Sequence, residues 1–257
     1  MLFFSKKTTI AASGVLQGAT DHHSHILPGV DDGVETMDEA LRILATYEAA
    51  GVKTLWLTPH IMEDIPNTPQ KLKARFAELQ AAYTGNITLH LAAEYMIDNN
   101  LRKLLQNHCP SCVRGTSDAV AEGVETNNLL PIGSKGNHLL VETSYFNPPM
   151  RLKETLRLIK SRGYYPLLAH PERYMYMEKE EYLELHEEGI KFQLNLASLA
   201  GGYGKTVKKK AEWLLKKELY SIAGSDLHCE DAIEFIIGCR IGEKEIKQVE
   251  QILHNCI

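Results

Sequence analysis

Segments with strand character alternate with helical segments along most of this 257-residue chain, and this alternation constrains its fold more than any other feature. Thr36-Met37-Asp38-Glu39 has the form of a capping box, and helical spacing continues from there to Gly51. Strands separated by helices favour a parallel sheet with crossover connections. About seven β/α units in one domain fit a closed barrel better than an open sheet. The predicted fold class is therefore α/β, with a TIM-barrel-like architecture.

The predicted elements follow one another without a linker or an internal repeat. Strands are expected at 52–57, 87–93, 138–141, 164–169, 192–196 and 220–224, and helices at 36–51, 68–83, 100–106, 149–162, 179–188 and 206–218. We therefore expect a single domain over residues 21–257, preceded by a loosely held lead-in over residues 1–20. An insertion near 107–136 is rich in Gly, Ser, Asn and Thr, which is typical of a lid or a disordered loop.

Charge, hydropathy and cysteine usage predict a cytoplasmic protein. The formal net charge of -5 gives no basic field for nucleic acid, so nucleic-acid binding is not expected. No apolar run approaches the length of a membrane span, and Lys6 and Lys7 follow the few N-terminal apolar residues, the reverse of a secretory signal. The five cysteines have no framework spacing, so we interpret the isolated C-x-x-C pair Cys109 and Cys112 as reduced thiols.

Metal-binding residue types recur where the predicted strands end. His23 and His25 lie two apart in an extended segment, so both imidazoles can face one point. The other residues of this kind at successive strand ends are His60, Glu94, Glu142, His170, Asp226 and His228. Each of them taken alone is better explained as a structural histidine or a solvated carboxylate. In a barrel, however, these ends gather on one face, so their joint placement predicts a metal site.

The number of candidate ligands indicates more than one ion. Mixed histidine and carboxylate ligation suits Zn²⁺, Mn²⁺ or Fe, and a carboxylate can bridge two ions. Three divalent ions with Asp32, Glu94, Glu142 and Asp226 would combine six positive charges with four negative ones, leaving about two positive charges. Such a pocket favours a phosphate group and lowers the pKa of bound water.

Five motifs in this arrangement resemble the PHP superfamily (polymerase and histidinol phosphatase), and within it the bacterial metal-dependent tyrosine-protein phosphatases of capsule and exopolysaccharide synthesis. The resemblance extends from Asp21 to His228. The motifs are His23-Ser24-His25-Ile26-Leu27-Pro28-Gly29-Val30-Asp31-Asp32-Gly33, Thr58-Pro59-His60, the strand ends at Glu94 and Glu142, Ala169-His170-Pro171-Glu172-Arg173-Tyr174, and Gly224-Ser225-Asp226-Leu227-His228.

The resemblance implies a distorted (β/α)7 barrel with a trinuclear centre, often Mn²⁺-dependent, with Fe or Zn²⁺ as alternatives. It assigns a first ion to His23, His25, Glu94 and Asp226. A second ion takes Glu94 as a bridge, together with Glu142 and His170, and a third takes Asp32, His60 and His228. Arg173 would hold the phosphate, for which its planar fork is suited. Asp31 and His22 are interpreted as bystanders.

The implied activity is hydrolysis of phosphotyrosine by metal-bound hydroxide, acting on a bacterial tyrosine kinase at the inner membrane. A phosphocysteine route is not expected, because no cysteine lies in a C-x₅-R phosphate loop. Two alternatives remain open: a phosphatase of a small phosphomonoester such as histidinol phosphate, and a non-catalytic metal-binding regulator. One motif departs from the family, since a second arginine commonly follows D-x-H, whereas here the first is Arg240.

Overall fold

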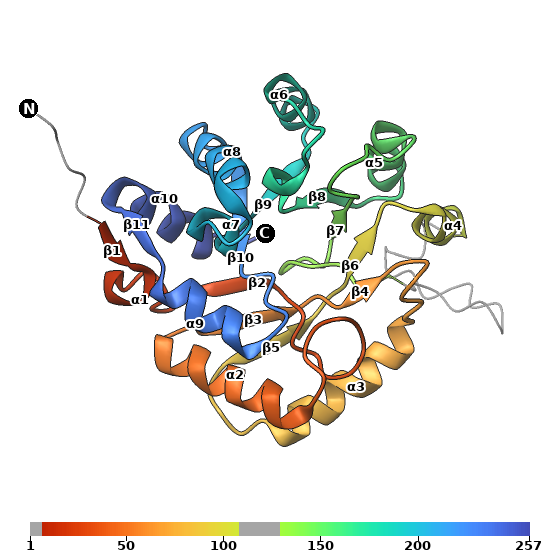
Figure 1. Cartoon of the computed structure of the whole chain (residues 1–257). Coiled ribbons are helices and arrows are strands. Elements are labelled where there is room, and N and C mark those ends of the chain that lie inside the picture. The colour runs from red at the N-terminus through yellow and green to blue at the C-terminus, as the bar shows by residue number, and fades with distance from the viewer. Residues whose placement is uncertain (1–6, 108–128) are drawn as a thin grey trace, which may run out of the picture.

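The computed structural model describes residues 7–107 and 129–257. Most of the expected insertion near 107–136, including the Cys109 and Cys112 pair, lies outside the described residues. The described part is a ring of parallel strands with helices around its outside (Figure 1). None of its helices is both long enough and apolar enough to cross a membrane.

The parallel strands form two sheets. One has the order β2-β3-β5, and the other has the order β10-β9-β8-β7-β6-β4. Their bounds are β2 (Thr20–Ser24), β3 (Thr54–Leu57), β4 (His60–Ile61), β5 (Thr88–Leu91), β6 (Glu94–Met96), β7 (His138–Glu142), β8 (Tyr165–Ala169), β9 (Lys191–Asn195) and β10 (Tyr220–Gly224). The chain passes from β3 to β4 and from β5 to β6 within two residues, so each pair is one strand path that changes sheet. Seven strand paths result.

The ring is completed between β10 and β2 without a continuous ladder. The Asp226 N–H donates to the His23 carbonyl at 2.8 Å, and the His25 N–H donates to the Leu227 carbonyl at 2.9 Å. A single parallel bridge joins Ser24 to Leu227. The prediction of a distorted, TIM-barrel-like α/β fold is confirmed, and the distortion lies in the change of sheet and in this short contact.

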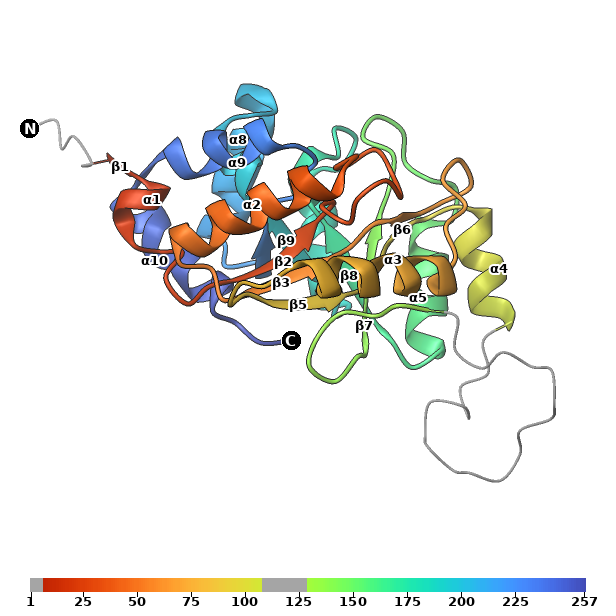
Figure 2. The same ribbon diagram turned by 90° about the horizontal axis from the view of Figure 1, so that it is seen from below.

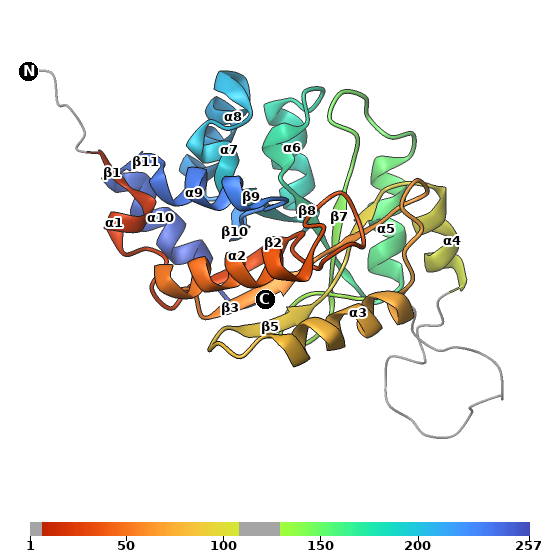
Figure 3. The same cartoon turned by 60° about the horizontal axis from the view of Figure 1, so that its bottom comes forward.

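The six helices with predicted bounds lie within three residues of those bounds at each end. The main helices are α2 (Met37–Ala50), α3 (Pro69–Ala82), α4 (Asn99–Asn107), α5 (Leu152–Ser161), α6 (Lys179–Glu187), α8 (Gly204–Lys216), α9 (Glu230–Gly238) and α10 (Glu243–Leu253). The Thr36 hydroxyl accepts the Glu39 N–H at 3.2 Å, so the predicted cap is present. Helices α2 and α3 cover the outside of β2, β3 and β5 (Figure 2), whereas α5, α6 and α8 lie along the six-stranded sheet (Figure 3).

Two apolar clusters hold the strands. The larger one packs the helices against the outside of the ring. The smaller one consists of Ala92, Ile132, Leu140, Leu167, Ala169 and Ile222. Leu140 lies two residues before Glu142, and Ala169 comes directly before His170, so this inner cluster supports the strand ends that carry the candidate ligands.

Residues 7–20 are held more firmly than the expected lead-in. Strand β1 (Lys7–Thr9) pairs antiparallel with β11 (Arg240–Gly242), and the short helix α1 (Ile10–Ser13) follows it. Ile10, Val15 and Leu16 are buried in the larger cluster. Three scattered apolar side chains gave no periodic pattern, and the pairing partner lies more than two hundred residues away, so the sequence alone did not reveal this contact.

Replacing Gly224 with alanine is expected to destabilise the fold, because β10 approaches β2 at this residue. A Cβ atom there would stand 2.5 Å from His23 Cβ and 2.7 Å from the His23 nitrogen. We expect Gly224→Ala to lower the free energy of unfolding by about 1–3 kcal/mol, the range for overpacking. Urea denaturation measures this change. Gly238→Ala is the control, since nothing lies within 4 Å of the added Cβ. Equal stability of the two variants would contradict the close approach.

Candidate metal centre

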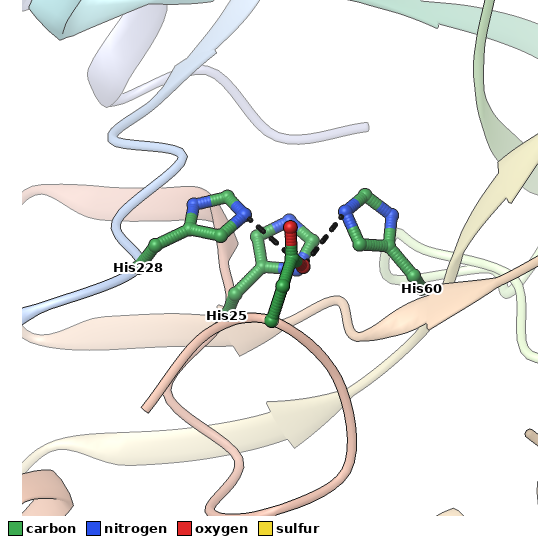
Figure 4. A group of neighbouring side chains, drawn as sticks. His25, His60 and His228 are labelled. Carbon is green, nitrogen blue, oxygen red and sulfur yellow. Dashed lines mark ion pairs between the residues drawn. The ribbon is translucent and has the colours of Figure 1, made fainter. Parts of the chain in front are cut away.

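The nine predicted metal ligands lie close together. Most stand at or just after strand ends, whereas His60 and Glu94 are the first residues of β4 and β6 and Asp32 lies in the loop after β2. Seven of the nine are buried, whereas the side chain of Asp32 is 65% exposed and that of His228 is 31% exposed. Ligand-type atoms form three groups within 4.8 Å: His25, Asp32, His60 and His228; His23, Glu94, His170 and Asp226; and His60, Glu94 and Glu142. Figure 4 shows the imidazoles of His25, after β2, His60, in β4, and His228, after β10, converging on one another.

Four atoms surround one point at the centre of the site. His23 Nε2 and His25 Nε2 are 3.0 Å apart, and each lies 3.3 Å from Glu94 Oε2. Each also lies 3.5 Å from Asp226 Oδ1. Ligand atoms bound to one ion at about 2.1 Å stand about 3.0–3.4 Å apart, depending on the coordination geometry. These spacings match the ligand set that the resemblance assigns to the first ion.

Glu94 connects this set to a second one. Its Oε1 lies 3.0 Å from His170 Nε2, while its Oε2 faces the two imidazoles of β2 and also lies 3.2 Å from His60 Nδ1. Glu142 joins the same cluster, with Oε1 at 3.2 Å from His60 Nδ1 and Oε2 at 3.8 Å from His170 Nε2. The two oxygens of Glu94 therefore face different partners, as those of a bridging carboxylate do.

The outermost group involves Asp32, in the loop between β2 and α2. Its Oδ1 lies 3.4 Å from His60 Nε2 and 3.7 Å from His228 Nε2. His25 also belongs to this group. The grouping thus differs from the implied assignment at three histidines. His60 directs one ring nitrogen to Asp32 and the other to the two glutamates. His25 falls in the group of Asp32, and His170 falls in the group of His23 and Asp226.

Buried polar atoms without hydrogen bonds support metal binding. Among the described residues, His60 Nδ1 and Glu94 Oε2 are buried and make no hydrogen bond, although charged partners lie within 3.3 Å of them. Burial, together with nearby Glu94 and Asp226, raises the pKa of Glu142 well above its ordinary value. A cation would satisfy both the orphaned atoms and the crowded carboxylates. The residues present therefore fit divalent ions.

His60 is available as a neutral ligand at physiological pH. Burial and the neighbouring His25 lower the pKa of its imidazole to about 4. An imidazole that binds a metal ion must be unprotonated. The environment of His60 therefore favours the protonation state that ligation needs.

Asp31 positions two of the histidines, so its interpretation as a bystander is wrong. Asp31 Oδ2 accepts the His60 backbone N–H at 3.0 Å and lies 2.9 Å from His25 Nδ1. Although burial opposes it, the contact with His25 lowers the pKa of Asp31 to about 2. With its Nδ1–H donated to this carboxylate, His25 presents Nε2 to the ligand group, the usual arrangement behind a metal-bound histidine. His22, in contrast, bonds to the Ala223 carbonyl.

Gln193 positions the His23 imidazole as Asp31 positions that of His25, and it was not identified from the sequence. Its Oε1 lies 3.0 Å from His23 Nδ1 and accepts the His170 backbone N–H at 3.1 Å. The side chain is fully buried in β9. A lone glutamine in an apolar strand carries no motif, and only its unusual polarity at a buried position could have drawn attention to it.

Arg173 lies beside the ligands, at the end of a 3-10 turn (Pro171–Arg173) that follows His170. Its Nη1 donates to Asp226 Oδ2 at 2.6 Å, and its side chain is 15% exposed. The structure thus places this predicted phosphate-binding residue at the site, and it adds a bond to Asp226 that the sequence did not indicate. Asp226 makes no other ion pair with an arginine of the described chain. Arg240 instead donates to the Lys7 carbonyl.

The chain matches known proteins over most of its length. The family model "Capsular polysaccharide synthesis, CpsB/CapC" matches residues 19–125 and 115–234. The chain is 24% identical over 242 residues to the putative tyrosine-protein phosphatase CapC of Staphylococcus aureus, covering 91% of this chain and 88% of that protein. It is 27% identical over 266 residues to the tyrosine-protein phosphatase CpsB of Streptococcus agalactiae, covering 91% and 98%.

The fold has a solved counterpart. The chain superposes with a TM-score of 0.71, at 21% sequence identity, on a crystal structure from a study of YwqE from Bacillus subtilis and CpsB from Streptococcus pneumoniae. That study describes the two proteins as unique metal-dependent tyrosine phosphatases. The match covers 93% of this chain and 95% of that one. Since the family model also spans most of the sequence, including all nine candidate ligands, the chain belongs to the CpsB/CapC family of capsular polysaccharide synthesis.

Proposed function

We propose that this protein is a metal-dependent protein-tyrosine phosphatase. The observation that carries the proposal is the cluster of His23, His25, Glu94 and Asp226, whose ligand atoms stand 3.0–3.5 Å apart directly beside Arg173. Metal-ligand spacing and a guanidinium together suit a doubly charged phosphoryl group. Relatives named as tyrosine-protein phosphatases support the same reaction.

The nine residues would hold three divalent ions. We assign His23, His25, Glu94 and Asp226 to one ion, Glu94, Glu142 and His170 to a second, and Asp32, His60 and His228 to a third, with Mn²⁺ as the favoured metal. Bound there, such ions lower the pKa of a water molecule and offset the charge of the phosphoryl oxygens. The oxygen- and nitrogen-rich set supports Mn²⁺, with Fe or Zn²⁺ as alternatives.

The chain's own residues orient the substrate. Arg173 binds the phosphoryl oxygens, and its bond to Asp226 keeps the guanidinium at the edge of the ligand cluster. A phenolate is a better leaving group than an alkoxide, so hydrolysis of phosphotyrosine needs no strong protein acid. This agrees with a site in which every buried acid is already paired with an imidazole or a guanidinium.

The substrate we propose is a phosphotyrosine on a bacterial tyrosine kinase at the inner membrane, and the protein itself would act in the cytoplasm. Membership of a capsular polysaccharide synthesis family supports a role in exopolysaccharide synthesis. The lack of a membrane-spanning helix in the described chain fits an enzyme that meets this partner from solution.

Parallel assays test the activity. The purified protein, titrated with Mn²⁺, is offered a phosphotyrosine peptide and histidinol phosphate, and phosphate release is measured. We expect clear preference for the phosphotyrosine peptide. Preference for histidinol phosphate would show that the substrates are small phosphomonoesters. An absence of turnover at every Mn²⁺ concentration would favour a non-catalytic metal-binding regulator.

Removing a ligand of the central cluster should abolish both metal binding and turnover. For His25→Ala and Asp226→Ala we expect less bound Mn²⁺ and at least a hundredfold loss of p-nitrophenyl phosphate hydrolysis, since each side chain contacts two or more others of the cluster. Elemental analysis measures the metal. His254→Ala is the control, because His254 is exposed and belongs to none of the three ligand groups. Wild-type metal content in His25→Ala would refute the ligand assignment.

Asp31 should matter for affinity although it is no ligand. Asp31→Ala leaves His25 Nδ1 without its buried acceptor, and we expect Mn²⁺ to bind 10- to 100-fold more weakly, the usual effect of losing such a partner. Isothermal titration calorimetry gives the dissociation constant. Asp64→Ala, at an exposed position, is the matched control. If Asp31→Ala and Asp64→Ala bind Mn²⁺ equally well, Asp31 does not support His25.

A further inference from the structure

Two tyrosines contact the guanidinium of Arg173. Tyr145 lies in the segment after β7, and Tyr203 directly precedes α8. The Arg173 Cζ atom lies 4.1 Å from the centroid of each ring. Both rings therefore contact the guanidinium, whose N–H donors lie in its plane and bind other groups through its edges.

One of these edges is already fixed. Arg173 Nη1 donates to Asp226 Oδ2, and Asn195 Nδ2 donates to the same oxygen at 2.8 Å. Asn195 also lies 3.4 Å from the Tyr203 hydroxyl, so it ties the ring to the carboxylate. Within residues 7–107 and 129–257, Arg173 Nε and Nη2 make no hydrogen bond. These donors remain available for a ligand.

The rims of the two rings border whatever those donors bind. A phosphate bound by these donors would lie in the guanidinium plane, so its ester group would stand near the two rings that contact the guanidinium. Tyr203 is 39% exposed, whereas Tyr145 is half-buried. Tyr203 therefore offers an open aromatic surface next to the position of the ester group.

We propose that Tyr203, whose ring contacts Arg173 as that of Tyr145 does, is a specificity-determining residue that selects aryl over alkyl phosphate esters. The inference rests on the proposed function for the placement of phosphate at Arg173. An aromatic leaving group packs against the exposed part of the Tyr203 ring, and aromatic rings favour offset or edge-to-face contact at such distances. An alkyl ester makes no equivalent contact.

Non-hydrolysable ligands test this selection without relying on turnover. The Mn²⁺-loaded protein is titrated with phenylphosphonate and with methylphosphonate by calorimetry. We expect wild type to bind phenylphosphonate more tightly. In Tyr203→Leu the ratio of the two dissociation constants should fall by about 3- to 10-fold, the usual range for an aromatic pair, with methylphosphonate binding little changed. Tyr203→Phe keeps the ring and should keep the preference.

A second tyrosine controls for general effects of the substitution. Tyr165→Leu alters a tyrosine that is 52% exposed at the start of β8, the strand end opposite to the site, and should leave the ratio unchanged. Thermal unfolding and bound Mn²⁺ are measured for each variant. If Tyr203→Leu fails to fold, the wild-type ratio together with that of Tyr203→Phe still decides, because equal binding of both phosphonates by wild type overturns the proposal.

The outcomes separate this inference from the proposed function. Equal weakening of both phosphonates in Tyr203→Leu would show that the ring only positions Arg173, and would overturn selection. Another combination is a preference for phenylphosphonate in wild type that is lost in Tyr203→Leu, together with no hydrolysis of phosphotyrosine by wild type. That combination would refute the proposed phosphatase activity and support aryl selection by Tyr203. Phosphotyrosine hydrolysis by wild type without any preference for phenylphosphonate would support the phosphatase activity and overturn aryl selection by Tyr203.

Discussion

The short contact between β10 and β2 is the constraint on which the site depends. No continuous ladder joins these strands. Two backbone hydrogen bonds and the side-chain hydrogen bonds of Asp21, His22 and Ser225 make the closure. Gly224 allows it, because any side chain at that position would meet His23. The same contact sets Asp226, from the last strand path, beside His23 and His25, from the first. The central ligand cluster is therefore a consequence of closing the ring, and residues from both ends of the fold are needed to build it.

Much of this arrangement could be predicted because it is written in local patterns. The cap at Thr36, the alternation of strands and helices, and the ligand-type residues at strand ends are all properties of short segments, and the structure bears them out. The parallel order of the strand paths then follows from the crossover connections. In a barrel the strand ends gather on one face, so the candidate ligands at those ends could be expected to lie close together.

The features that sequence did not reveal depend on three-dimensional detail. Asp31 and Asp32 are adjacent carboxylates of equal chemistry, and only the path of the loop sends one beneath His25 and the other toward His228. Gln193 acts through a hydrogen bond between strands that are remote in sequence. The pairing of residues 7–9 with residues 240–242 is a contact across almost the whole chain. None of these has a local signature.

The two oxygens of Glu94 have a consequence for how the centre fills. Because Oε1 faces His170 and Oε2 faces the histidines of β2, an ion on either side fixes the carboxylate orientation that the other side needs. The binding free energies of neighbouring ions are then linked through one shared side chain. Replacing Glu94 would therefore change the affinity of both neighbouring positions at once, and no variant of this residue could empty one of them alone.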